Sequence, residues 1–160
     1  MKTIIKAGVA IAILCGLWEM LMGVTGWYKD PSLMNVFYVV ILIQIAVLVW
    51  GLRKTAADRG YAGQLGAGTL MSLVAGILII GISLLFTTVL YPHYFEEIRI
   101  VTESTLRSKG LSDAEVMAQL RAAEVMMTPM MNAFAGFLGT MFTGVIASAI
   151  IAIFVRKKPV

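Results

Sequence analysis

Four apolar stretches, each long enough to cross a bilayer as a helix, make up most of this 160-residue chain. A helix rises about 1.5 Å per residue and the hydrocarbon core is about 30 Å thick, so one crossing needs about 20 apolar residues. The pattern predicts an all-α integral membrane protein with a single membrane domain over residues 1–160. We expect spans at residues 4–28, 33–52, 68–91 and 130–155, and a charged segment at 92–128 between the last two.

Composition agrees with a membrane location. Hydrophobic residues make up 59% of the chain and charged residues 14%, and the formal net charge is +4. The basic residues gather at the ends of the apolar stretches, where the positive-inside rule accounts for them, so we expect no nucleic-acid partner. The single cysteine, Cys15, lies inside the first stretch, which excludes an intramolecular disulfide and a thiolate metal cluster.

The first apolar stretch is predicted to stay attached as a helix. A cleavable signal peptide would have a shorter apolar core followed by a hydrophilic mature sequence. Here the apolar run continues past Cys15 to Trp27, and Leu14 does not suit the small residue that lipoprotein processing needs. We therefore expect an uncleaved first span.

The distribution of lysine and arginine predicts the orientation of the chain. Cytoplasmic segments of membrane proteins retain positive charge. In the long segment at 92–128 the carboxylates offset the basic residues. One side of the membrane, by contrast, collects an excess of lysine and arginine. That side holds Lys2, Lys6, Arg53, Lys54, Arg59, Arg156, Lys157 and Lys158. We expect a multi-pass protein of the bacterial cytoplasmic (inner) membrane with both termini in the cytoplasm.

The charged segment at 92–128 reads as a helical hairpin on the outer side. Gly110 suits a left-handed helix C-terminus, and Ser112 with Glu115 three residues later forms a capping box that starts a second helix. Apolar residues recur at helical spacing on both sides of this turn. Thr128 and Pro129 then provide an N-cap and a first-turn proline for the fourth span.

Small residues recur every four positions in the spans, which lets helix backbones approach closely in lipid. The fourth span has two such ridges, and they predict a tight bundle with this helix near its centre. The same ridges could equally pack against another subunit. The ridge residues are Gly136, Thr140, Gly144, Ser148 and Ala152, beside Ala135, Gly139, Thr143 and Ala147, with Gly8, Ala12 and Gly16 in the first span and Gly68, Ser72 and Gly76 in the third.

Glu19 is the one ionisable carboxylate deep inside a span, where charge is costly and needs a partner or a proton. Gln44 lies at a comparable depth in the second span. Ser83, Thr140 and Thr143 are further candidates for an intramembrane polar cluster. One hypothesis makes Glu19 a proton-titrating or cation-binding group in a transport path. The other makes it neutral and hydrogen-bonded to a neighbouring helix.

Two weak metal sites are conceivable near the outer ends of the third and fourth spans. His93 shares a helix face with Glu96 and Glu97, but a metal usually needs three or four ligands and the chain has one histidine. Methionine thioethers favour soft ions such as Cu(I), and methionines cluster at Met126, Met127, Met130 and Met131. The alternative is that these methionines fill irregular gaps or form an adaptable contact surface.

No catalytic motif accompanies these features, so we expect neither an enzyme nor a bound cofactor. The glycine-dense segment from Gly60 to Gly68 does not match the dinucleotide-binding fingerprint. We interpret it as a flexible inner loop and the start of the third helix.

The chain also resembles a bacterial family catalogued as domain of unknown function 4199. The resemblance rests on the Gly60 to Gly66 segment, the turn from Gly110 to Glu115, Thr128–Pro129 and the basic end at Val155 to Lys158. It implies four spans and no assigned activity. It transfers no functional residues.

These features leave three hypotheses for function. The one we favour is a non-catalytic scaffold or accessory subunit that engages a membrane-protein partner, or copies of itself, through small-residue ridges and the outer hairpin. The second is a small transporter or channel that uses Glu19. The third is copper handling by the outer methionines.

Overall fold

The computed structural model describes residues 1–157, apart from the side chain of Met34, and these residues contain helices and no strands. Lys158, counted above with the basic residues, lies outside this range. The α-helices are α1 (Lys2–Thr25), α2 (Val39–Thr55), α3 (Tyr61–Leu85), α4 (Tyr94–Ser108), α5 (Asp113–Glu124) and α6 (Pro129–Phe154). Shorter turns are the 3-10 helices η1 (Trp27–Lys29), η2 (Met34–Tyr38) and η3 (Ala56–Asp58) and the π-helix η4 (Phe86–Leu90).

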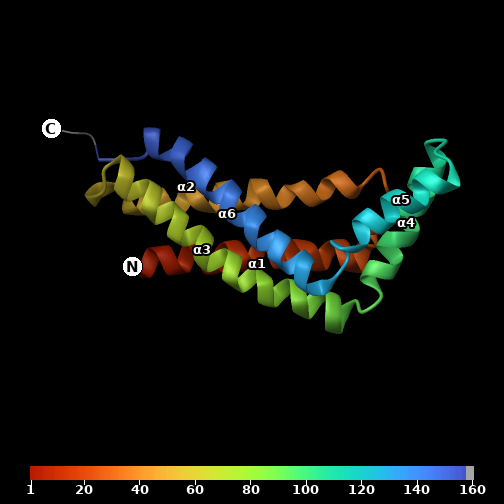
Figure 1. The fold of residues 1–160 in the computed structure, drawn as a ribbon. Helices are drawn as coiled ribbons and strands as arrows, with labels where there is room; N and C mark the ends of the chain where they lie inside the picture. The colour runs from red at the N-terminus through yellow and green to blue at the C-terminus, as the bar shows by residue number, and fades with distance from the viewer. Residues whose placement is uncertain (158–160) are drawn as a thin grey trace.

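The four long helices run side by side in one bundle (Figure 1). The bundle has a terminal end, where α1 begins and α6 ends, and a hairpin end, where α4 and α5 lie. Figure 1 shows α4 and α5 lying steeply across the bundle instead of continuing the direction of the long helices. The hairpin therefore covers the end of the bundle.

The surface of the bundle is apolar. The structure has four helices that are long and apolar enough to cross a membrane. Large apolar side chains such as Leu42, Ile77 and Phe142 are exposed along them, Phe142 by 71%. A continuous apolar surface of this kind is disfavoured in water and matches contact with lipid chains. The structure is thus that of a multi-pass membrane protein, as the sequence predicted.

The third long helix occupies the centre of the bundle. α3 packs against α1, α2 and α6, whereas α6 packs chiefly on α3 and secondarily on α2. The expectation that the fourth span would be central is wrong. The small residues of α3 lie on more than one face, and this lets three neighbours approach the same helix.

The contact between α3 and α6 depends on two reciprocal glycine–serine pairs. Gly144 lies against Ser72, and Gly68 lies against Ser148. A β-carbon added to either glycine would overlap the opposing serine side chain. Both serines are completely buried. The two helix backbones therefore approach as closely as glycine permits, and the ridge predicted on the fourth span is used within the chain.

The other predicted ridges also pack mostly within the chain. A β-carbon at Gly16 would come within 2.9 Å of Ile82, and one at Gly76 within 2.8 Å of the Phe137 ring. Gly139 is the exception, because a β-carbon there would meet open space. The full set of close contacts pairs Gly8 with Met71 and Val74, Gly16 with Ile82, Gly76 with Phe137 and Gly136 with Ile79.

Two predicted boundaries differ from the structure. α3 begins at Tyr61, seven residues before the predicted start at 68, so the segment expected to be a flexible inner loop is already helical. The buried Gln64 side chain stabilises this first turn, because its Nε2 donates to Leu52 O and Val155 O, both at 2.8 Å. The second span opens with the 3-10 turn η2 before α2 starts at Val39.

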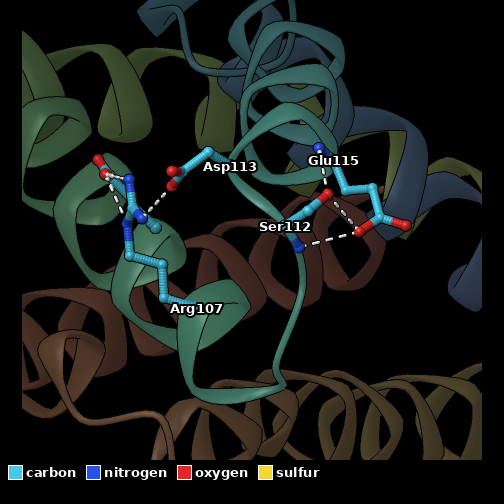
Figure 2. Close-up of polar contacts among 5 residues, drawn as sticks. Arg107, Ser112, Asp113 and Glu115 are labelled. Carbon is cyan, nitrogen blue, oxygen red and sulfur yellow. Dashed lines mark hydrogen bonds and ion pairs between the residues drawn. The ribbon is translucent and has the colours of Figure 1, made fainter.

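The turn between α4 and α5 follows its sequence signals (Figure 2). Gly110 adopts φ 78°, a left-handed conformation that favours glycine. Ser112 Oγ accepts from the Glu115 backbone N–H, and Glu115 accepts from the Ser112 N–H at 2.9 Å, which completes the capping box. Arg107 also donates to Asp113 across the turn. The predicted helix stop and restart are confirmed.

The hairpin has its own small core. Leu106 of α4 packs with Val116 and Leu120 of α5, and the two α5 residues are almost completely buried. Arg99 Nη2 lies 3.5 Å from Glu124 Oε1 between the two helices. α4 and α5 thus form one packed unit. α6 starts as predicted, with the Thr128 hydroxyl accepting from the Met131 N–H and Pro129 in the first turn.

Candidate functional site

Of the polar residues expected to meet inside the bundle, Gln44 and Thr140 are in contact, and Ser83 has a different hydrogen-bond partner. Gln44 is buried, and its Nε2 donates to the backbone oxygen of Thr140 at 2.7 Å. The same nitrogen lies 3.5 Å from Ser72 Oγ. Gln44 therefore links α2 to α6 and α3. It does not contact Glu19 by any hydrogen bond within the described residues.

A second polar contact lies nearer the hairpin end. Ser83 of α3 accepts from Asn132 Nδ2 of α6 at 3.0 Å. Thr87, in η4, donates to the Ser83 backbone oxygen at 2.8 Å. Asn132 was missed in the sequence because it lies in the first turns of the fourth span, where a polar residue is common. Thr143, a predicted member of the cluster, is half-buried on α6.

Glu19 faces the interior of the hairpin half of the bundle. One turn earlier on α1, Cys15 Sγ lies 3.7 Å from the Val40 oxygen of α2. One turn later, Gly23 lies against Phe86 and Tyr91. Residues four apart share a helix face, so the Glu19 side chain points between α2 and the end of α3. The described part of the chain offers its carboxylate no hydrogen bond, and the group is half-buried.

An aromatic collar lies beyond Glu19 toward the hairpin end. We define it as Tyr28, Phe86, Tyr91 and Tyr94. The Phe86 and Tyr91 rings are 4.6 Å apart between centroids, and Tyr28 and Tyr94 are 5.1 Å apart. η4 positions two of them, because the π-helical turn ends with the Tyr91 N–H donating to the Phe86 oxygen at 2.8 Å. Single π-turns of this kind are frequent at functional sites. The collar joins η1, η4 and α4 in one contact.

The carboxylate of Glu97 connects this collar to the surface. Tyr28 donates its hydroxyl to Glu97 Oε2, and Lys29 Nζ donates to Oε1 at 2.8 Å. Tyr28 is buried, while the Lys29 and Glu97 side chains are 47% and 35% exposed. These bonds fasten α4 to η1 across 68 residues of sequence. The hairpin is thus held on the bundle by a side-chain clamp.

The electrostatics of the clamp follow from these bonds. The hydrogen bond from Lys29, and then the one from Tyr28, lower the pKa of the Glu97 carboxyl. Burial first, and the bond to Glu97 second, raise the pKa of Tyr28, so its hydroxyl stays a donor. Burial raises the pKa of Tyr94 to about 12, with the nearby Glu19 as the next cause. Tyr94 is therefore a neutral phenol.

An open depression of about 420 Å³ lies beside the clamp. Its walls come from the end of α1 and η1 on one side and from η4 and the start of α4 on the other. Tyr28, Lys29, Tyr91, Tyr94 and Glu97 contribute to its lining. The depression combines aromatic rings with the Glu97 carboxylate, which Lys29 and Tyr28 already engage.

The predicted metal ligands His93 and Glu97 have different side-chain partners. His93 Nδ1 lies 3.3 Å from Glu96 Oε2, whereas Glu97 is engaged by Lys29 and Tyr28. Within residues 1–157 no group of three histidine, cysteine, aspartate or glutamate side chains is placed to hold a metal. The methionines of the copper hypothesis lie at the surface: Met126, Met130 and Met131 are 50%, 64% and 36% exposed, and Met127 is half-buried. That hypothesis stays a prediction.

A second clamp, at the terminal end, was missed in the sequence. Gln64 Nε2 donates to Leu52 O of α2 and to Val155 O after α6, and its Oε1 accepts from Thr55 Oγ1 at 2.7 Å. The side chain is completely buried. Its position inside a glycine-dense segment concealed it, although a lone amide among small residues next to a span is a signal for such a role.

Comparison with known proteins identifies the family of the chain. The model of the family described as "Protein of unknown function (DUF4199)" matches residues 6–157, nearly the whole chain. No curated protein and no solved structure matches the chain significantly.

Proposed function

Because this chain belongs to the DUF4199 family, whose description assigns no activity, we propose its role from its own geometry. It is a non-catalytic scaffold or accessory subunit of the bacterial cytoplasmic membrane. It engages a membrane-protein partner or another copy of itself through the hairpin formed by α4 and α5. The termini lie in the cytoplasm and the hairpin lies on the outer side.

The distribution of charge supports this orientation. The terminal end of the bundle carries seven described basic residues against one carboxylate, Asp58. They are Lys2, Lys6, Arg53, Lys54, Arg59, Arg156 and Lys157. In the hairpin region several basic side chains pair with carboxylates, as Lys29 does with Glu97 and Arg107 with Glu103. An excess of positive charge at one end favours the cytoplasmic side.

The observation that carries the proposal is a rigid hairpin with exposed apolar side chains. The clamp at Glu97 holds the hairpin on the bundle, and the core at Leu106 packs its two helices together, so the hairpin is not a flexible loop. Ile100 on α4 is 62% exposed and Met117 on α5 is 42% exposed, and Val125 after α5 is 65% exposed. These residues lie outside the four long apolar helices. Exposed apolar residues on a packed extramembranous unit are typical of a protein contact surface.

The small-residue ridges, by contrast, support the fold more than a partner. Gly68, Gly144 and Ser148 are buried between α3 and α6, so the ridge that they form is not open to another subunit. Gly139 is the ridge residue with open space beside it. We therefore assign partner contact to the hairpin.

The test is gentle solubilisation from native membranes, followed by mass determination of the intact particle and identification of its components. We expect a defined particle larger than one chain. Ile100→Glu should release the partner, because it places a charge in the apolar contact. Gln119→Glu adds the same charge at an exposed polar position of the hairpin and should leave the particle intact. A monomeric wild-type particle, or equal loss in both variants, would contradict the proposal.

A second candidate is a small transporter or channel that uses Glu19. It is favoured by the absence of a hydrogen-bond partner for this carboxylate among the described residues and by its position below the aromatic collar. An intramembrane carboxylate of this kind is a functional candidate by default. Under the scaffold proposal Glu19→Gln leaves the particle assembled and causes no change in ion flux in liposomes. A pH-dependent flux that Glu19→Gln abolishes would favour the transporter instead.

A further inference from the structure

Basic residues from two distant parts of the sequence meet at one corner of the terminal end. Arg59 precedes α3, and Arg156 and Lys157 follow α6. The Lys157 backbone N–H donates to the Arg59 oxygen at 2.9 Å, which joins the two segments directly. Figure 1 shows the segment directly after α6 beside the connection between α2 and α3. We call Arg59, Arg156 and Lys157 the basic corner.

Buried contacts hold this corner in place. The Gln64 side chain ties Leu52 of α2 to Val155, the residue directly before Arg156. Because Gln64 is completely buried, the ends of α2, α3 and α6 are fixed relative to one another. The basic side chains therefore project from a rigid base, and less conformational entropy is lost when they bind.

The guanidinium groups of the corner are oriented by their neighbours. The Arg156 guanidinium lies over the Tyr61 ring, 5.8 Å from its centroid. Arg59 Nη1 lies 3.5 Å from the Gly63 oxygen. Neither contact neutralises the positive charge, and Arg156 is exposed while Arg59 is half-buried. Both groups keep free N–H donors for an anion.

Local charge is not balanced within the described residues. Arg53 and Lys54 at the end of α2 add to the three cations of the corner. Asp58 is the one carboxylate at this end of the bundle, and no salt bridge engages it in the part of the chain described. This end of the bundle therefore carries a net positive charge that attracts anions.

We propose that the basic corner binds the phosphate group of an anionic phospholipid. The corner lies at the ends of three apolar helices, and Trp50 near the end of α2 and Tyr61 at the start of α3 are exposed, as is typical of aromatic residues at the membrane–water interface. At this depth the abundant anion is a lipid headgroup. Arginine forks bind phosphate oxygens in bidentate geometry, and a cluster of lysine and arginine next to the ends of membrane helices suits an anionic headgroup. This proposal depends on the membrane location and not on the role of the hairpin.

The test is native mass spectrometry of the full chain in detergent, titrated with dioleoylphosphatidylglycerol, dioleoylphosphatidylcholine or inorganic phosphate. We expect tighter binding of phosphatidylglycerol than of phosphatidylcholine. The double variant Arg59→Gln, Arg156→Gln should weaken phosphatidylglycerol binding about tenfold or more, since each basic residue near a membrane surface contributes about a fivefold effect.

Two matched variants make the outcome decisive. Lys157→Gln keeps the backbone bond to Arg59 and removes one charge, so it tests the corner even if the double variant fails to fold. Lys2→Gln with Lys6→Gln removes two charges from the start of α1, which Figure 1 shows on the other side of the bundle at the same end. We expect weaker lipid binding from the former and wild-type binding from the latter.

Three results would overturn the proposal. The first is equal affinity of the wild type for phosphatidylglycerol and phosphatidylcholine. The second is equal loss in the Lys2 and Lys6 control, which would indicate general surface charge. The third is displacement of the lipid by inorganic phosphate at millimolar concentration, which would make a soluble anion the ligand.

Discussion

Gly144→Ala is expected to unfold or severely destabilise the protein, although it adds a single methyl group. That methyl would overlap Ser72 Cβ and Oγ, and it would lie 3.0 Å from Gln44 Nε2. Because both helices are held by further contacts, they can separate only by losing packing along their length. Overpacking typically costs about 1–3 kcal/mol and occasionally more, and the overlap here is severe enough for the upper end of that range. Unfolding in mixed micelles of increasing SDS content would measure the loss.

Gly139→Ala is the matched control for this prediction. Gly139 is on the same helix, and a methyl group there meets open space. Alanine favours a helix over glycine by about 0.5–1 kcal/mol, so this variant should be neutral or slightly more stable. Ser72→Gly in the Gly144→Ala background removes the overlapping side chain and should restore most of the stability. If both glycine variants behaved alike, the α3–α6 contact described above would be wrong.

Gln64→Leu should produce the second largest effect. It removes two donor bonds, to Leu52 O and Val155 O, and one acceptor bond from Thr55. At about 0.6 kcal/mol for an average hydrogen bond between membrane helices, the loss is about 2 kcal/mol. The segment after α6 should also detach, which limited trypsin digestion after Arg156 would detect as faster cleavage.

Thr55→Val is the control for Gln64→Leu. It removes the one hydroxyl bond to Gln64 and retains both bonds to backbone oxygens, so we expect about a third of the stability loss and no change in cleavage after Arg156. Equal effects of the two variants would show that the Gln64 amide does not hold the ends of the helices together.

Local signals in the sequence predicted much of this fold. Long apolar stretches give membrane helices regardless of their partners, and the four were confirmed. The capping box at Ser112 and Glu115 and the first turn at Thr128 and Pro129 were confirmed, because each depends on residues within a few positions. The membrane family suggested by the Gly60, Gly110 and Thr128 segments was confirmed over residues 6–157.

Contacts between distant residues were not predictable in the same way. Depth in the membrane suggested Gln44 as a neighbour of Glu19, but depth does not fix the direction in which a side chain points around its helix. Gln44 instead reaches the Thr140 backbone oxygen. The clamp between Tyr28, Lys29 and Glu97 joins residues 68 or 69 positions apart, and no local pattern records such a pairing.

The glycine-dense start of α3 shows how local propensity was overridden. Glycine disfavours helices in water, so the segment around Gly63 and Gly66 was predicted as a loop. Inside the bundle the first turn is helical from Tyr61, because Gln64 finds buried acceptors on α2 and after α6. The cost of glycine is offset by these bonds, and the sequence around Gln64 gives no sign of partners so far away.

The side of the membrane on which the hairpin lies is the central claim of this account, and labelling of single cysteines tests it most directly. In a Cys15→Ala background, one variant places cysteine at Lys109 in the exposed hairpin turn, and another places it at Lys54 at the terminal end. A membrane-impermeant maleimide applied to intact bacterial cells should label the Lys109→Cys variant. The Lys54→Cys variant should react only after the cells are permeabilised. The reverse pattern would place the hairpin in the cytoplasm and contradict the account.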